Sequence, residues 1–431
     1  MHLFDTTTLL AGLLATRHAR LALAITYEDV EHTFDTLQTW YNASTGTYED
    51  STGWWNSAVC MTMLAKYASI DDSIKQRTDY LWDDVFTKAP QHNSEMTTSF
   101  GSAWKRQAAS ISVPRRHKLK KRGTAAANVG FLNGFYDDQG WWALAWIAVY
   151  DHTGGQKYLD EAITIFNDMH TAWNTTPVGG IWWDKQHSYV NAIANELHFS
   201  VAAHLANRCP QDKEKYTSMA QDAWNWLYAS GMINSNNNVE DGLLAGSHPG
   251  NTKMVWSYNQ GVILSALTEL SRATAQPIFT QIAKVVANAA LVNLTGPNNG
   301  TYDGDFVLRD PCEAGGGCGQ DGASFKGVFA SNLAGLLHNT NNPTYARFLK
   351  ANADSLWTKG LDQYNRLNVA WDGSSKETPG ASSQCSGMGL LVGALSELGQ
   401  WESTKSPEAR GAGLATSLTP ERWRKRFFGL W

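Results

Sequence analysis

Features that would place this 431-residue chain in a membrane, metal or nucleic-acid class are missing from its sequence. Beyond the amino-terminal segment no run approaches the roughly 18 uninterrupted apolar residues of a membrane helix, so we expect no membrane span. The five cysteines lack zinc-ligand spacing, and His187, His198 and His204 lack metal-ligand spacing. We therefore expect no metal and no other cofactor. No nucleic-acid-binding motif occurs, so no nucleic-acid partner is expected, and strand-like alternation is sparse.

Acidic residues are absent from one stretch of an otherwise acidic chain. Between Gly101 and Tyr136 there are eight Lys and Arg and no Asp or Glu. The formal net charge of the whole chain is −5, so the remainder without those eight carries −13. We expect a solvated or disordered insertion at about 101–127. A nucleic-acid-binding or targeting patch is the alternative, and a translated intron remnant would look the same.

The two ends of the chain suggest export without a lipid anchor. Residues 1–24 form a candidate signal peptide with an A-x-A ending, although Arg17, His18 and Arg20 interrupt its apolar run. The tail, 403–431, lacks the hydrophobic run of a lipid-anchor signal. We expect a secreted or cell-wall protein, and a monomer. Four N-x-S/T sequons are compatible with this: Asn42, Asn174, Asn293 and Asn299.

The cysteines suit the same oxidising location. Cys312 and Cys318 flank the glycine-rich stretch CEAGGGC, which is flexible enough to close a small disulfide loop. Cys60, Cys209 and Cys385 lie in helical patterns, and the sequence leaves their pairing open.

Tryptophan is abundant, with 19 residues. Indole rings suit stacking on sugars but are also ordinary core residues, so composition gives carbohydrate binding only modest support. Residues 134–146, GFYDDQGWWALAW, place two aspartates among aromatic residues. One interpretation is a helix N-terminus, where acids are favoured. The other is a pair of catalytic carboxylates beneath a sugar-stacking wall.

One unit recurs along the chain: a polar or glycine-rich opening followed by an apolar run with helical spacing. Its six occurrences are 52–68, 137–150, 189–206, 257–270, 324–338 and 383–399. More amphipathic segments with a charged face lie between them, at 72–86, 156–173, 213–230 and 342–360. A helix that is apolar nearly all round is buried, whereas one with a polar stripe faces water.

This alternation predicts an all-α fold, an (α/α)6 barrel of six inner and six outer helices spanning 25–402. An open α-solenoid is the competing arrangement. In a toroid the segments leading into the inner helices line a funnel at one rim. Polar side chains fall there in several units: Asp137, Asp138, Asn191, Asn195, Glu196, Tyr258, Asn259, Gln260, Asp321 and Lys326.

From Tyr27 to about Gln400 the sequence resembles glycoside hydrolase family 76, the α-1,6-mannanases and their fungal relatives. The motifs that carry the resemblance are TGWWNSA, FYDDQGWWALAWI, GGIWWD, NAIANELHFSVAAHLA, WSYNQGVILSALTEL and CEAGGGCGQDGASFKG. The resemblance implies an (α/α)6 barrel and endo-hydrolysis of α-1,6-linked mannan with retention of configuration. It also implies that Asp137 and Asp138 are the catalytic pair, with Asp137 as nucleophile and Asp138 as acid/base.

Other residues are candidates for substrate binding. Tyr136, Trp141 and Trp142 could form a low-dielectric wall around the pair. Trp182, Trp183 and Asp184 suit a stacking platform at the rim. Asn195, Glu196, Tyr258, Asn259 and Gln260 could bind sugar hydroxyls, but Asn and Gln also cap helices and a buried Glu can have a structural partner. Asp321 and Lys326 could bind substrate or form a salt bridge with each other.

Two other functions stay open. A cell-wall mannan transglycosylase would use the same aspartates, with a sugar hydroxyl in place of water. A non-catalytic glycan-binding toroid would bind without turnover, and the intact aspartate pair speaks against it.

Overall fold

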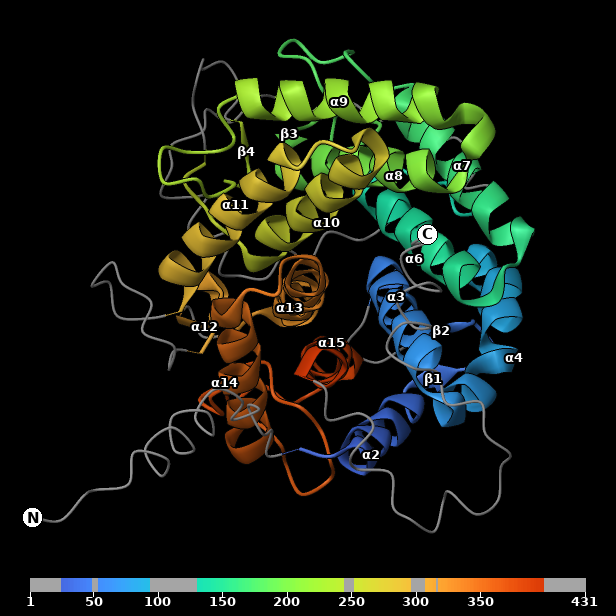
Figure 1. The fold of residues 1–431 in the computed structure, drawn as a ribbon. Helices are drawn as coiled ribbons and strands as arrows, with labels where there is room; N and C mark the ends of the chain where they lie inside the picture. The colour runs from blue at the N-terminus through green and yellow to red at the C-terminus, as the bar shows by residue number, and fades with distance from the viewer. Residues whose placement is uncertain are drawn as a thin grey trace, which may run out of the picture.

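The computed structural model describes residues 25–48, 53–93, 130–243, 252–295, 307–314 and 317–398. The candidate signal peptide (1–24), the basic insertion (101–127) and the tail (403–431) lie outside these residues. The described chain forms two concentric rings of helices (Figure 1). None of its helices combines the length and the apolar character that crossing a bilayer requires.

The inner ring consists of α3 (Trp54–Ile70), α6 (Tyr136–Thr153), α8 (Ala192–Arg208), α10 (Ser257–Thr274), α13 (Gly319–Thr340) and α15 (Ala381–Leu398). The outer ring consists of α2 (Tyr27–Gln38), α4 (Asp72–Lys88), α7 (Gln156–His170), α9 (Lys213–Ala229), α11 (Ile278–Leu294) and α14 (Pro343–Lys359). Each inner helix packs on the next, and α15 returns to α3 (Figure 1). The expected (α/α)6 barrel is therefore confirmed, and the six repeated segments form its inner helices.

Short elements occupy the connections between helices. Strand β1 (Tyr41–Asn42) pairs antiparallel with β2 (Thr47–Tyr48), with Tyr41 opposite Tyr48. Strand β3 (Val190–Asn191) pairs antiparallel with β4 (Gly242–Leu243), with Val190 opposite Leu243. The remaining short helices are η1 (Ala89–His92), η2 (Pro210–Asp212) and α12 (Pro311–Ala314).

The two rings differ in burial as their sequence patterns predict. Helix α8 buries residues on every face, since both the ring axis and the outer helices cover it. Helix α7 buries one stripe at helical spacing and leaves the opposite face to water. The buried residues of α7 are Tyr158, Leu159, Ala162, Ile165, Phe166 and Met169.

Some helices of each ring begin with a side-chain cap and others do not. In the outer ring, Asp71 caps α4 by accepting a hydrogen bond of 2.7 Å from the Ser73 amide, and Thr26 forms a capping box with Asp29 on α2. In the inner ring, the N-cap residues of α6 and α10 are Phe135 and Trp256, which provide no side-chain cap. The first amides of these two helices are bonded to other segments instead: the Tyr136 amide donates to the Trp183 carbonyl at 2.9 Å, and the Ser257 amide donates to Asp310 Oδ1 at 2.7 Å.

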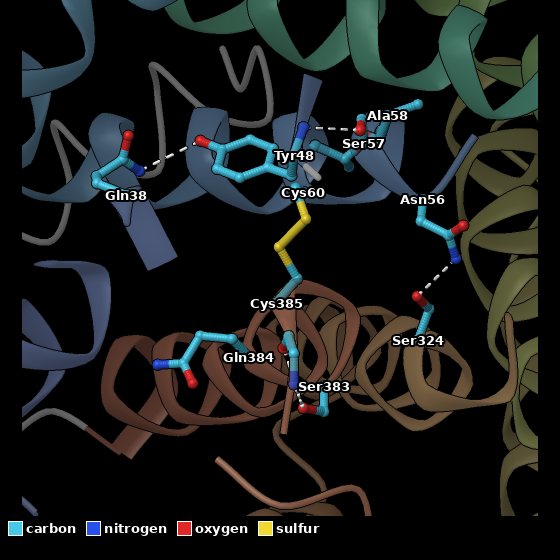
Figure 2. Close-up of a disulfide and its surroundings, with 12 residues drawn as sticks. Gln38, Tyr48, Asn56, Ser57, Ala58, Cys60, Ser324, Ser383, Gln384 and Cys385 are labelled. Carbon is cyan, nitrogen blue, oxygen red and sulfur yellow. Dashed lines mark hydrogen bonds between the residues drawn. A yellow bond between two sulfur atoms is a disulfide. The ribbon is translucent and has the colours of Figure 1, made fainter. Parts of the chain in front are cut away.

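A disulfide closes the inner ring between its first and last helices. Cys60 on α3 and Cys385 on α15 are bonded across 325 residues of chain (Figure 2). Nearby, Asn56 of α3 donates a hydrogen bond of 3.0 Å to Ser324 of α13 (Figure 2). The pairing that the sequence left open is thus between Cys60 and Cys385, whereas Cys209 is free and buried. The expected disulfide between Cys312 and Cys318 is present as well.

Amide side chains of the inner helices hold the segments that precede them. Asn195 accepts a bond of 2.8 Å from the Ile181 amide and donates one of 3.0 Å to its carbonyl. Gln260 makes the same pair of bonds to Val239, at 2.8 and 2.7 Å. Both residues are buried. The sequence suggested Asn195 and Gln260 as substrate contacts; that expectation is corrected here, because the backbone already uses their polar atoms.

Candidate active site

The adjacent carboxyl groups lie in the first turn of α6. Phe135 holds the N-cap position, so neither Asp137 nor Asp138 is the capping residue. The start of this helix is fixed from outside the repeat, because the Tyr136 amide donates a bond of 2.9 Å to the Trp183 carbonyl. The pair therefore stands at the rim of the ring, and its side chains have partners other than the helix start.

Asp137 is held by an indole from a neighbouring connection. Trp183 Nε1 donates a hydrogen bond of 2.8 Å to Asp137 Oδ2. The other oxygen, Oδ1, is buried and has no hydrogen-bond partner. This arrangement orients the carboxyl while leaving one oxygen unengaged.

The connection that carries Trp183 is organised by the residue after it. Asp184 accepts bonds from the Gln186 amide at 2.9 Å and the Ser188 amide at 3.0 Å, and it is buried. Its carboxylate is therefore already hydrogen-bonded within the loop. Asp184 is a scaffold residue and not the substrate contact that the sequence suggested.

Asp138 is held by a different donor. Asn133 Nδ2 donates a bond of 2.8 Å to Asp138 Oδ2, and Asn133 Oδ1 accepts a bond of 2.8 Å from the Phe135 amide. Asn133 is buried, so both of its interactions are shielded from water. It fixes the side chain of Asp138 and the backbone turn into α6 together.

Burial raises the pKa of both carboxyl groups. For Asp137, loss of solvent is the largest cause; the Trp183 bond opposes it, and the charge of Asp321 adds to it. For Asp138, burial and the charge of Asp137 hold the pKa well above its usual range, and the Asn133 bond opposes this only in part. Two such neighbours do not both ionise readily. The pair therefore retains a proton close to neutral pH.

A third carboxyl group faces the pair from α13. Asp321 accepts a bond of 3.0 Å from Trp55 Nε1, and burial raises its pKa to about 6. The Trp55 ring stacks on Trp141 with ring centroids 5.5 Å apart. Trp141 and Trp55 together form the floor beneath the carboxyl cluster.

The opposite side of the mouth is built from α8 and α10. Tyr258 stacks on Phe325 with ring centroids 4.0 Å apart. Glu196 is buried with neither carboxyl oxygen bonded, and Asn259 is buried with neither amide atom bonded. Burial raises the pKa of Glu196 well above its usual range, and the charge of Asp241 adds to the effect.

Asp241 belongs to the same cluster but is partnered. Tyr189 donates a bond of 2.9 Å to Asp241 Oδ2. Burial raises the pKa of Asp241 to about 6 even though the Tyr189 and Trp256 bonds oppose the shift.

Three further sequence candidates lie away from the carboxyl cluster. Trp142 is fully buried among core aromatic rings, including Trp54 with its centroid 5.2 Å away. Tyr136 bonds Thr171 beside the outer helix α7. Trp142 and Tyr136 thus have partners within the helical rings, and their contact with substrate stays a prediction.

Lys326 is the third of these candidates. It forms a buried ion pair with Glu313 at 2.8 Å, not with Asp321, and donates to the Leu308 carbonyl. Its ammonium group therefore secures the segment that contains α12 and does not point to substrate.

Trp182 is half-buried and stacks on His187 with ring centroids 4.9 Å apart.

Four residues of the site escaped sequence reasoning. Asn133 had a usable signal, because an Asn side chain often accepts a hydrogen bond from the backbone amide two residues further on and so forms a turn. Trp55 lies in TGWW, a motif that recurs as QGWW at 139–142, so the repeat itself could have indicated it. Tyr189 and Asp241 are 52 residues apart and gave no local signal. Among the described residues, no three His, Cys, Asp or Glu side chains converge as metal ligands.

Comparison with known proteins gives a consistent result. The family model described as glycosyl hydrolase family 76 matches residues 20–401. Mannan endo-1,6-alpha-mannosidase DCW1 of Candida albicans is 28% identical over 236 residues, 51% of this chain and 51% of the relative. Mannan endo-1,6-alpha-mannosidase DFG5 of Saccharomyces cerevisiae is 25% identical over 217 residues, 46% of this chain and 45% of the relative. The chain spans about half the length of the curated relatives it matches.

Solved structures share the fold. Dfg5 from Chaetomium thermophilum, in complex with glucosamine, has a TM-score of 0.66 at 17% identity and covers 94% of this chain and 97% of that one. The α-1,6-mannanase GH76A of Salegentibacter sp. HEL1_6, in complex with α-1,6-mannotriose, has a TM-score of 0.65 at 20% identity. That match covers 85% of this chain and 98% of the other, which is an inactive variant with two consecutive aspartates changed to asparagine.

Proposed function

The chain belongs to glycosyl hydrolase family 76, and we propose that it hydrolyses α-1,6-mannosidic bonds within mannan with retention of anomeric configuration. The observation that carries the proposal is the aspartate pair itself. Asp137 and Asp138 are adjacent at the rim, each has its own hydrogen-bond donor, and burial raises the pKa of both. A retaining glycosidase needs this combination of one carboxylate and one carboxylic acid.

In the proposed reaction an Asp137 oxygen attacks the anomeric carbon while Asp138 gives its proton to the glycosidic oxygen. The bond between that oxygen and the anomeric carbon breaks, and a mannosyl ester of Asp137 remains. Asp138, now ionised, takes a proton from water as the water oxygen attacks the anomeric carbon and releases Asp137.

The contacts of the two side chains support this division of roles. Asp137 has one oxygen fixed by Trp183 and one oxygen without a partner, which suits a nucleophile. Burial and the charge of Asp137 raise the pKa of Asp138, which suits the group that must hold a proton. Successive side chains on a helix diverge by about 100°. That divergence is compatible with the roughly 5 Å carboxyl separation of retaining enzymes.

The substrate-binding part of the proposal rests on side chains that remain unengaged. Glu196 and Asn259 have buried polar atoms without partners, which sugar hydroxyls could satisfy. Tyr258, Trp141, Trp182 and Trp183 supply aromatic surface near the pair, and Asp321 supplies a further acceptor. Within this proposal the protein acts outside the cell or in its wall, since two disulfides favour an oxidising location.

The deciding experiment is incubation of purified protein with unbranched α-1,6-mannan, with products resolved by size and by anomeric form. Short oligosaccharides of retained anomer are expected. Elongated products would support the transglycosylase instead, and binding without any new product would support the glycan-binding toroid.

The roles of the two aspartates are tested separately. Asp138→Asn should lower turnover of mannan by roughly 10²- to 10⁴-fold. Mannosides with a good leaving group should stay partly active in the first step, because their departure needs no acid. Asp83→Asn, on the exposed face of α4, is the matched control and should leave both rates unchanged. An Asp138→Asn enzyme with an ordinary mannanase rate would end the assignment.

A further inference from the structure

The ring encloses a second space at the end opposite the aspartate pair. A cavity of about 220 Å³ lies along the barrel axis, and its lining extends from Trp141, Val262 and Val328 in the amino-terminal halves of inner helices to the carboxyl-terminal ends of the ring. We name it the axial chamber. Its inner end is Trp141, whose ring stacks on Trp55 in the floor of the carboxyl cluster. The chamber is therefore separated from the candidate active site by a pair of indoles.

The walls of the axial chamber are mainly apolar. Hydroxyl side chains such as Thr62, Ser265 and Thr268 line the cavity among apolar side chains from five of the inner helices. The apolar side chains include Val59, Met63, Leu144, Val262, Val328 and Val392. An apolar cavity of this kind favours the hydrocarbon part of a ligand over water.

The outer end of the chamber is ionic, and almost all of its charges are matched. Arg208 donates to Asp151 at 2.8 Å and forms an ion pair with Glu269 at 3.3 Å. Glu397 pairs with His338 at 3.4 Å, and Arg272 pairs with Glu269. Asp151 and Glu269 are thus paired with guanidinium groups, and Glu397 is paired with a histidine.

Lys66 differs from these groups. Its ammonium donates a bond of 3.0 Å to the Ser331 hydroxyl, and no described carboxylate lies within ion-pair distance of it. Burial lowers its pKa to about 8, although the more distant charges of Asp151 and Glu269 oppose the shift. At neutral pH the chamber thus holds one largely protonated ammonium without a counter-ion at contact distance, beside a hydroxyl that can also donate.

We propose that the axial chamber binds a small amphipathic carboxylate, with its anionic head on Lys66 and Ser331 and its hydrocarbon tail directed towards Trp141. The size agrees with this class of ligand. A cavity of about 150 Å³ accommodates the six carbons of benzene. By proportion, the axial chamber accommodates about eight or nine non-hydrogen atoms, the size of hexanoate. This site is separate from the proposed mannan site and does not depend on it.

The test uses hexanoate as the probe and the whole protein. Binding is measured by isothermal titration and by the thermal midpoint, with sodium chloride of equal ionic strength in the reference. Wild-type protein should bind hexanoate and gain thermal stability. Lys66→Met should weaken hexanoate binding at least tenfold, whereas Lys376→Met, at an exposed lysine, should bind as the wild type does.

A second variant fills the space and leaves the ammonium in place. Gly335 lines the chamber, and a Cβ built there meets no atom within 4 Å. Gly335→Leu should therefore fold, keep its thermal midpoint and lose hexanoate binding. Three results would overturn the proposal: no binding by the wild type, unchanged binding by Gly335→Leu, or equal affinity for hexanoate and the uncharged 1-hexanol.

Discussion

The two ends of the inner ring place their buried carboxyl groups in opposite electrostatic settings. At the amino-terminal ends of the helices, Asp137, Asp138 and Asp321 have neutral hydrogen-bond donors, and burial raises the pKa of each. At the carboxyl-terminal ends, Glu269 is also buried, but the charges of Arg208 and other cations lower its pKa to about 2.

The difference shows how one scaffold separates reactivity from stability. Burial is common to both ends, so burial alone does not decide protonation. Whether a cation is placed beside the carboxyl decides it. None of the described cations forms an ion pair with Asp137, Asp138 or Asp321, so the rim holds a proton available near neutral pH. The other end compensates its acids with Arg208 and Arg272, which fixes α8 and α10 to each other and to α6.

The largest expected effect comes from removing the nucleophile at the rim. Asp137→Asn should lower mannan hydrolysis by roughly 10⁴-fold or more, because no mannosyl ester can form. Unlike Asp138→Asn, it should also abolish turnover of mannosides with good leaving groups. Initial rates on both substrates measure this. Retained activity towards the activated substrate would show that the two roles are reversed.

At the other end the expected effect is on stability. Arg208→Met leaves Asp151 and Glu269 without their main cation, and breaking a buried ion pair in this way costs about 3–5 kcal/mol. Denaturant unfolding measures the loss. At a temperature where the variant is folded, kcat/KM on mannan should match the wild type. A large fall in kcat/KM of the folded variant would contradict the separation of the two ends.

Stability should also depend on pH in opposite directions at the two ends. The raised pKa of Asp137, about 7 against an ordinary 3.8, means that its contribution to stability is lost as pH rises between those values. The lowered pKa of Glu269 means that its contribution is present above an ordinary 4.5 and lost as pH falls towards 2.

The double variant Asp137→Asn, Asp138→Asn isolates the contribution of the rim. At pH 8 its thermal midpoint should exceed that of the wild type by several degrees, because two buried carboxyl groups whose ionisation is unfavourable have been removed. The difference should disappear near pH 4, where the wild-type carboxyls are protonated. Thermal midpoints across this range decide the matter, and a constant difference at all pH values would refute it.

The smallest expected effect is that of the third rim carboxyl. Asp321 raises the pKa of Asp137, so Asp321→Asn should move the acidic limb of the kcat/KM profile to lower pH by less than about one unit. Loss of the Trp55 bond acceptor should be tolerated, since an asparagine oxygen still accepts. A pH–rate profile of wild type and variant measures the shift, and a shift to higher pH would be the wrong sign.

Sequence patterns led to the fold because burial differs between the two rings. An inner helix is covered by neighbours on every side and is apolar all round, whereas an outer helix is covered on one side and keeps a charged face. This difference can be recognised from the spacing of apolar and charged residues in the sequence. The Asp137–Asp138 pair and the Cys312–Cys318 loop were also local. By contrast, Asn195, Gln260 and Lys326 lie near the starts of inner helices, where substrate contacts were expected. Their hydrogen-bond and ion-pair partners come from other segments of the chain.

The sequence by itself determined the alternation of helices, the adjacency of the two acids and the enrichment in tryptophan. Only the tertiary structure decided that Trp183 and Asn133 hold the acids, that Cys60 meets Cys385, and that Trp142 belongs to the core. The physical reason is that helix periodicity is a property of neighbouring residues. Hydrogen bonding, pKa and exposure depend on which distant segments the closed ring brings together.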